Sequence, residues 1–348
     1  MSLNLRTLCG AVVLLFLVAI PFALGDYGHC LLATIMIYAL VALSFNVLLG
    51  LGGQISIGHA AFWAIGAYAC ALSVINLGLP FLLGVAFAGI MAALFGALVA
   101  LPALRVQGHY LAIATLGFAL IVQQVLFEWE TLTGGRQGLF VPRPSLFGVE
   151  LTSDFSYYYL LLGIFLLIAW ITGNFAYSFT GRSLAALRMS TVAAECCGIA
   201  RPRHIIIAFA MSAFCTGISG ALYGHLLGHL STETFSLAVS LSFLSMAVIG
   251  GLHSRAGALL GGAYLALAPE VLREFKDAQM VIYGVTLVVC VQFLPRGLSS
   301  LLEPVQRAFN SLRRRWACPG HPRFAPGTQD VDARDNPRIK SRDAHDGA

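Results

Sequence analysis

The chain of 348 residues is 58% hydrophobic and only 11% charged, with a mean hydropathy of +0.81. Soluble domains carry about 25% charged residues, so this composition excludes a water-soluble globular protein. The net charge of +5 gives no support for nucleic-acid binding, because in a membrane protein the positions of basic residues matter more than their sum.

Long apolar segments follow one another along most of the chain. A helix needs about 20 mainly apolar residues to cross a bilayer. Only helices and closed barrels satisfy the backbone in lipid, and runs this apolar are not the alternating strands of a barrel. We therefore predict an all-α integral membrane protein, a polytopic bundle of about ten transmembrane helices (8–10), at 8–25, 30–50, 55–76, 80–101, 109–128, 157–175, 204–224, 235–251, 256–273 and 279–295.

Three of these segments admit a second interpretation. Residues 1–25 have the order of a signal peptide, with Arg6, an apolar run and then Pro21 to Gly25, but the many later spans favour a retained first helix. The segments 235–251 and 256–273 are short or rich in glycine. They are either full spans or broken, partly inserted helices.

The basic residues are distributed unevenly between the predicted loops. With ten spans and the N-terminus inside, 17 of the 21 Lys and Arg residues face the cytoplasm. Without the five basic residues beyond Cys318, the balance is still 12 inside against 4 outside. Because cytoplasmic loops carry the excess of Lys and Arg, we predict an N-in, C-in topology.

The C-terminal segment differs in composition from the rest. Residues 1–300 form the predicted transmembrane domain, whereas 301–348 form a basic tail, rich in Pro, Asp, Arg and Gly after about residue 317, that is predicted to be disordered. Arg313, Arg314 and Arg315 lie before the polar part. They either contact anionic lipid headgroups or act as a solvated stop signal.

A faint internal repeat joins two glycine-rich segments. Gly52-Gly53 leads to Gly66-Ala-Tyr68, and Gly250-Gly251 leads to Gly262-Ala-Tyr264. Many transporters are built from repeats with interrupted helices at corresponding places. Because glycine is common in membrane helices, a chance resemblance is the alternative.

Polar residues inside the spans are few and are densest between Asn46 and His59. This segment also contains Gln54, Ser56 and four glycines in nine residues. Glycine weakens a helix and allows close backbone approach, and polar groups in a membrane usually face the bundle interior or a water path. The segment is either a broken helix that exposes backbone groups to a polar solute or a packing face of small residues.

Other polar groups give no support for catalysis or metal binding. His225 and His229 have an i, i+4 spacing, but no Glu or Cys nearby completes a ligand set, so we predict a polar loop and no metal. No GxSxG motif and no GxxxxGK[ST] motif is present, so we predict no catalytic residues and no nucleotide site in this chain. The eight cysteines form no CxxC pair and are interpreted as small apolar residues.

A long basic loop at 176–203 separates two predicted spans. Residues 183–197 are compatible with a helix that Gly198 would end, and Pro202 precedes the next span. A short amphipathic helix of this kind suits docking into a groove on a soluble partner. The alternative is a helix that lies on the lipid headgroups.

Several motifs resemble one known family. Ala193-Ala-Glu-Cys-Cys-Gly198 looks like the EAA-type coupling loop of bacterial ABC-importer permeases. The stretches 49–62, 108–118, 132–138 and 219–225 resemble, in order and spacing, the LivM-type permease subunit of branched-chain amino acid importers. The resemblance covers roughly residues 30–300. Cys196 and Cys197 depart from it, because small or aliphatic residues are usual there.

The resemblance implies a set of partners. They are a second homologous permease subunit forming a heterodimer, two cytoplasmic ATPase subunits that bind the ATP, and a periplasmic solute-binding protein, with no cofactor in this chain. The coupling role would fall on Gly181, Arg182, Arg188, Ala194, Glu195 and Gly198. The translocation path would be lined by Asn46, Gln54, Ser56, His59 and Tyr110.

The function implied by the resemblance is ATP-driven import of branched-chain or related amino acids. Related permeases are associated with urea, amides or aromatic acids, and these substrates stay open. An ion-coupled secondary transporter would need acidic residues in mid-span, and Glu270 lies near a span end. An intramembrane enzyme using His59 or His225 would need a catalytic set that the sequence does not offer.

Overall fold

The computed structural model describes residues 17–23, 25–106, 108–146, 149–150, 153–251, 255–271 and 284–285. The chain divides into two units, Met1–Leu302 and Glu303–Ala348, and every described residue belongs to the first. Most of the predicted span 8–25, nearly all of 279–295 and the whole tail 301–348 lie outside the described residues.

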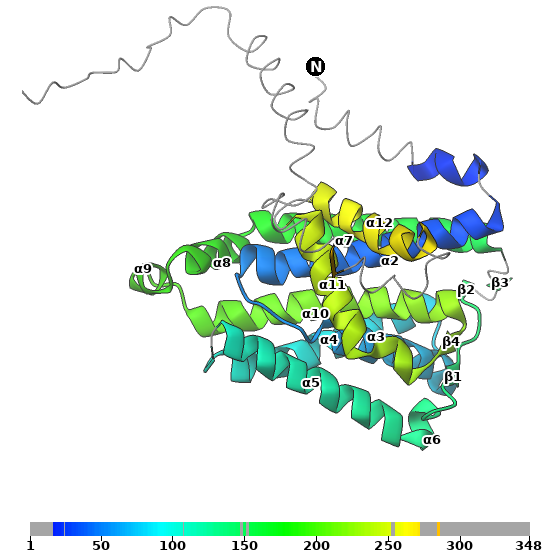
Figure 1. Cartoon of the computed structure of the whole chain (residues 1–348), viewed down its shortest axis with the longest axis horizontal. Coiled ribbons are helices and arrows are strands. Elements are labelled where there is room, and N and C mark those ends of the chain that lie inside the picture. Colours follow the sequence, from blue (N-terminus) through cyan, green and yellow to red (C-terminus); the bar gives the residue numbers. More distant parts are fainter. Residues whose placement is uncertain are drawn as a thin grey trace, which may run out of the picture. The chain divides into compact units, whose positions relative to one another are not determined.

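Six helices in the described part are long and apolar enough to cross a membrane (Figure 1). They are α2 with its continuation η2 (Tyr27–Leu51), α3 (His59–Leu77), α4 (Phe81–Ala103), α5 (His109–Glu128), α7 (Asp154–Tyr177) and α10 (Arg201–Leu227). Six predicted spans are thereby confirmed as helices to within a few residues. The total of ten, the N-in, C-in topology and the internal repeat stay predictions.

Two further helices are shorter. The helix α11 (Leu237–Gly250) has 14 residues and α12 (Arg255–Val271) has 17. At 1.5 Å per residue α11 is about 21 Å long, which is less than the roughly 30 Å of a hydrocarbon core. Of the two interpretations of the segment 235–251, the structure favours a helix too short to span the core alone.

Short elements connect these helices. They are η1 (Ile20–Ala23), α6 (Glu130–Thr133), α8 (Phe179–Met189), α9 (Thr191–Cys196), η3 (Thr232–Phe235) and the strands β1 (Leu139–Phe140), β2 (Ser145–Leu146), β3 (Val149–Glu150) and β4 (His229–Leu230). The strands form two antiparallel pairs, β1 with β4 and β2 with β3. Figure 1 shows α8 and α9 at one end of the bundle, hereafter the α9 end, and β1, β4 and α6 at the opposite end, hereafter the β4 end.

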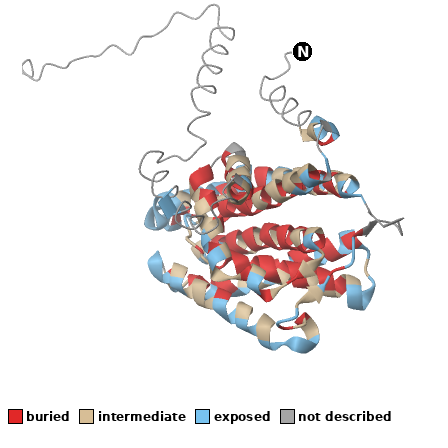
Figure 2. Cartoon of the chain, turned by 45° about the vertical axis from the view of Figure 1, so that its right-hand side comes forward, coloured by how far each residue is buried: buried red, intermediate tan, exposed pale blue. Residues whose placement is uncertain are grey.

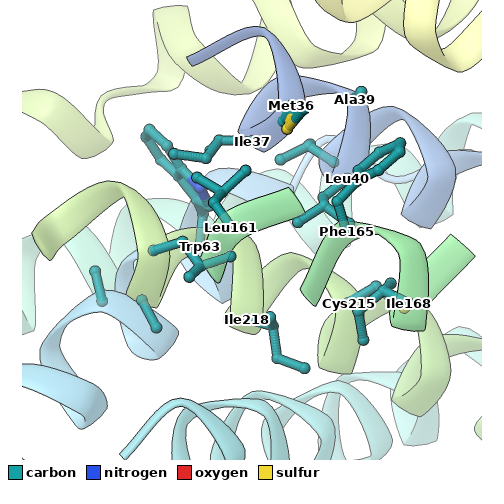
Figure 3. Close-up of a cluster of buried hydrophobic side chains, with 14 of the residues drawn as sticks. Met36, Ile37, Ala39, Leu40, Trp63, Leu161, Phe165, Ile168, Cys215 and Ile218 are labelled. Atoms are coloured by element: carbon teal, nitrogen blue, oxygen red, sulfur yellow. The ribbon is translucent and has the colours of Figure 1, made fainter. Parts of the chain in front are cut away.

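The centre of the bundle is α10, which packs against α2, α3 and α4. Within an apolar stretch of 18 residues in each helix, 72% of the residues of α10 are buried, against 17% of those of α5. Figure 2 shows the same contrast. The buried side chains of Trp63, Phe165, Cys215 and Ile218 gather between α2, α3, α7 and α10 (Figure 3). The helix α5 therefore leaves most of its surface for lipid or for a partner protein.

Small residues bring the central helices into close contact. A Cβ atom on Gly66 of α3 would overlap the backbone of Gly217 in α10, and one on Gly220 would overlap the carbonyl oxygen of Trp63. Such close approach is typical of helix pairs in membranes, because lipid offers no hydrophobic driving force between them. The crossing of α3 and α10 therefore depends on these glycines.

Replacing Gly66 by alanine should separate α3 from α10 and destabilise the fold by about 1–3 kcal/mol, the usual cost of overpacking. The measurement is the thermal unfolding of the purified protein in detergent. Gly163→Ala in α7 is the matched control, because a Cβ there meets no atom within 4 Å. Equal midpoints for the two variants would contradict the packing described above.

Candidate functional site: an interrupted helix beneath a basic loop

The helix α2 (Asp26–Phe45) does not continue directly into α3. It continues as a π-helix, η2 (Asn46–Leu51), and the chain then runs without helix from Gly53 to Gly58 before α3 begins at His59. π-helical turns are rare and are frequent at functional sites. The predicted helix over 55–76 is thus wrong at its start, because residues 55–58 are not helical.

This non-helical segment, residues 53–58, leads from the exposed Gly53 to the fully buried His59 in the bundle interior. The ring of His59 packs parallel to Phe45 with centroids 3.7 Å apart, and its Nε2 lies 3.0 Å from the hydroxyl of Ser212. Ser212 is eleven residues beyond the start of α10, which corresponds to about 16 Å of helix rise. The interruption between α2 and α3 is therefore deep, as expected for a broken transmembrane helix.

Side chains from other helices satisfy the backbone of the interruption. The N–H of Ile57 donates to the hydroxyl of Thr115 in α5 (3.0 Å), and the N–H of Ala60 donates to the hydroxyl of Ser240 in α11 (3.1 Å). Non-helical backbone at membrane depth persists only where protein or a water-filled cavity surrounds it. Thr115 of α5 therefore holds the segment 53–58, and Ser240 of α11 holds the first turn of α3 that follows it.

The five predicted path residues occupy different environments. Ser56 and His59 are buried, while Asn46 and Gln54 are half-buried. Gln54 donates its side-chain amide to the carbonyl oxygen of Gly52 (3.1 Å). Tyr110, on α5, is 73% exposed, and no ring contact or hydrogen bond links it to the other four among the described residues. The structure brings four of the five together at the interruption.

His59 holds three helices together. The Ser212 hydroxyl donates to the carbonyl oxygen of Ser44 (2.9 Å), so it accepts from the Nε2–H of His59. The imidazole thereby connects the start of α3 with the end of α2 and the middle of α10. In this conformation His59 is closed off from any solute.

The basic loop 176–203 forms two short helices instead of one. The predicted helix over 183–197 is wrong in its continuity, since it breaks at Ser190 between α8 and α9. The hydroxyls of Ser178 and Ser190 accept hydrogen bonds from the N–H groups of Gly181 and Ala193, which caps each helix. The predicted stop at Gly198 is confirmed, because this residue has a left-handed φ of +82°.

The coupling residues predicted in this loop divide into buried and exposed groups. Gly181 and Ala194 are buried, and a Cβ on Gly181 would overlap the carbonyl oxygen of Phe175. Arg182, Glu195 and Gly198 are exposed. Beside them Met189 and Val192 are 88% and 71% exposed, a large apolar area for a short loop. The α9 tip, defined as residues 189–198, is therefore suited to a protein partner.

Arg188 connects this loop to the interrupted helix. Its Nη1 donates to the carbonyl oxygen of Gly50 in η2 at 2.6 Å, across 138 residues of sequence. Its aliphatic stem covers Gly53, where a Cβ would lie 2.9 Å from the Arg188 Cγ. Gly53 has a φ of +64°, which glycine adopts at little cost. Sequence patterns did not predict this contact.

The two histidines considered for a metal lie near the β4 end. His225 is buried in α10, with Nδ1 2.9 Å from the carbonyl oxygen of Ala221, and His229 is in β4, where its ring packs against Phe140. Among the described residues no group of three His, Cys, Asp or Glu is arranged to hold a metal ion.

A family model and several known proteins that match this chain are all permease components of branched-chain amino acid transport systems. Residues 30–291 match the family described as "Branched-chain amino acid transport system / permease component". The high-affinity branched-chain amino acid transport system permease protein LivM of Escherichia coli is 32% identical in an alignment 317 positions long, which covers 84% of this chain and 74% of the relative.

Two relatives from Salmonella typhimurium extend the comparison. Its LivM permease protein is 31% identical in an alignment of 316 positions that covers 84% of this chain and 74% of the relative. Its LivH permease protein is 27% identical in an alignment of 284 positions that covers 75% of this chain and 90% of the relative. No solved structure matches this chain.

Proposed function

The chain belongs to the family of permease components of branched-chain amino acid transport systems, and from this premise we propose that it is one of two homologous permease subunits of an ATP-driven importer in a bacterial inner membrane. Escherichia coli K12 has both a LivM and a LivH permease protein for a high-affinity branched-chain amino acid transport system, and this chain is similar to both. A heterodimer of two related permeases fits that pairing. The weakly buried α5 leaves surface for the second subunit.

The ATP would be bound by two separate ATPase subunits on the cytoplasmic side. In this proposal they dock on the α9 tip, whose exposed Met189 and Val192 offer apolar contacts and whose Glu195 offers a charge. A soluble binding protein on the opposite side would deliver the solute. This chain would contribute the translocation path for the solute and the contact that links the ATPase-binding loop to the interrupted helix.

The contact between Arg188 and Gly50 is the observation that carries the coupling mechanism. A displacement of α8 and α9 by the ATPases would act on the carbonyl oxygen of Gly50, which belongs to the π-helix. The interruption would then rearrange and uncover Ser56 and His59 to the solute path together with Asn46 and Gln54. Such a switch needs differential affinity of the ATP-bound ATPases for the two arrangements.

The substrate class follows from the family, and we propose leucine, isoleucine and valine. Urea, amides or aromatic acids are the competing substrates, and no described feature of the interruption favours them. The test is uptake of labelled leucine by proteoliposomes that hold this chain, its second permease and their ATPases, with the binding protein added.

The expected result is leucine accumulation that requires ATP and the binding protein and is unaffected by ionophores. Uptake that needs an ion gradient and proceeds without ATP would contradict the proposal and favour a secondary transporter. Uptake of urea or an amide with exclusion of leucine would refute the substrate and leave the transport class intact.

A further inference from the structure

A recess of about 570 Å³ lies against the second half of α5. This half of α5 runs toward α6 and away from α8 and α9 (Figure 1). Its volume is in the range of small-molecule sites, about 300–1,000 Å³. The recess is lined by Leu120, Ile121, Gln123, Gln124 and Phe127 of α5 and by Thr232 and Glu233 of η3. None of these residues takes part in the interruption or the coupling loop.

The lining of the recess combines apolar side chains with two amides that lie within a membrane-spanning helix. Gln123 and Gln124 are two adjacent amides inside an otherwise apolar span, only five and four residues from its end at Glu128. Polar side chains within membrane helices generally face a bundle interior or a water-filled cavity. Leu120, Ile121 and Phe127 supply apolar surface beside them. The recess can therefore accept a solute with one polar and one apolar part.

The charges around the recess match a zwitterion. Glu233 is exposed, and among the described residues its carboxylate has no ion-pair partner. The guanidinium of Arg136 lies 4.8 Å from the centroid of the Phe127 ring, so a cation lies one aromatic ring away from the recess. Glu233 and two amides line the cavity, and the Arg136 cation lies close to it. The amide of Gln124 donates to the carboxylate of Glu128 (3.0 Å), which leaves the amide of Gln123 for a solute.

On the premise of the proposed function, we propose that this recess is an entry subsite for a zwitterionic amino acid with an apolar side chain. The Glu233 carboxylate accepts hydrogen bonds from the ammonium group, and the amide of Gln123 donates to the carboxylate of the solute. The side chain of the solute packs against Leu120, Ile121 and Phe127. The predicted topology places the recess on the outer side, where a binding protein would release its solute.

The test uses the complete complex of both permeases and ATPases without the binding protein, so that only the membrane subunits can bind. Leucine should raise the unfolding temperature of this complex, because a ligand that binds the native state stabilises it. Isocaproate, which is leucine without the amino group, should raise it much less. This preference reports on the ammonium contact.

Glu233→Gln should weaken leucine binding at least tenfold, the usual effect of losing a hydrogen bond to a charged group, and should remove the preference for leucine over isocaproate. Gln123→Met provides a second variant, compatible with lipid, that should weaken binding of both ligands, because both carry the carboxylate that the Gln123 amide would bind. Glu130→Gln is the matched control, since this exposed glutamate of the same end does not line the recess.

The outcomes separate this subsite from the transport function. Unchanged leucine binding and preference in Glu233→Gln, with ATP-driven leucine uptake in the wild type, would overturn the subsite and leave the transporter in place. Failure of the wild type to transport leucine would overturn the proposed function itself. Loss of preference only in Glu130→Gln would also overturn the subsite.

Discussion

Replacing Arg188 by glutamine is expected to reduce solute uptake at least tenfold while the assembled complex still hydrolyses ATP. The variant removes the charge-assisted hydrogen bond to the carbonyl oxygen of Gly50, whose contribution is about 1.5–3 kcal/mol. It leaves the exposed α9 tip intact, so the ATPases should still bind. The measurement is the number of solute molecules transported per ATP hydrolysed in proteoliposomes.

Two further variants sharpen this prediction. Gly53→Ala should give the same defect, because its Cβ would displace the stem of Arg188 and the residue would be strained at a φ of +64°. Arg105→Gln is the matched control. This arginine follows the end of α4, is exposed, and makes no side-chain hydrogen bond or ion pair among the described residues. A normal ratio of transport to hydrolysis in Arg188→Gln would refute the proposed connection.

The double variant Glu195→Lys, Gly198→Trp is expected to abolish ATPase association. The first change reverses a charge on the exposed tip, and the second places a bulky side chain at a residue with a φ of +82°. Loss of one interfacial charge contact and of the local geometry should weaken binding by well over 1.4 kcal/mol, or more than tenfold. Co-purification of the ATPase with tagged permease measures this directly.

The control for this experiment lies at the opposite end of the molecule. Glu130→Lys reverses an exposed glutamate on α6 without touching the α9 tip. It should retain the ATPase at the wild-type level. If the double variant binds the ATPase as well as Glu130→Lys does, the tip is not the docking site, and a helix resting on lipid headgroups is the better interpretation.

Hydropathy predicts the helices of this protein well because bilayer thickness fixes their length. The spans at 80–101 and 109–128 agree with α4 and α5 to within two residues at each end. Length is also why the segment 235–251 stood out as doubtful, and α11 indeed has only 14 residues. The total of ten helices involves segments that lie outside the described residues.

The details of the site were less predictable because they depend on contacts between distant segments. The glycines and polar residues between Asn46 and His59 are compatible with both a broken helix and a packing face, and hydropathy alone places the start of the next helix too early. The break at Ser190 depends on a hydroxyl that caps α9, and serine is also common within helices. Arg188 and Gly50 meet only because α8 folds back onto η2, and a single sequence contains no sign of that pairing.

The proposed coupling requires the interruption to move when ATP binds, and thiol labelling at residue 54 tests this most directly. In a complex whose native cysteines are replaced by serine or alanine, Gln54→Cys is exposed to a membrane-impermeant maleimide with and without ATP. We expect labelling rates that differ between the two states, and loss of that difference when Arg188→Gln is added. Equal rates in both nucleotide states of a complex that transports solute would contradict it.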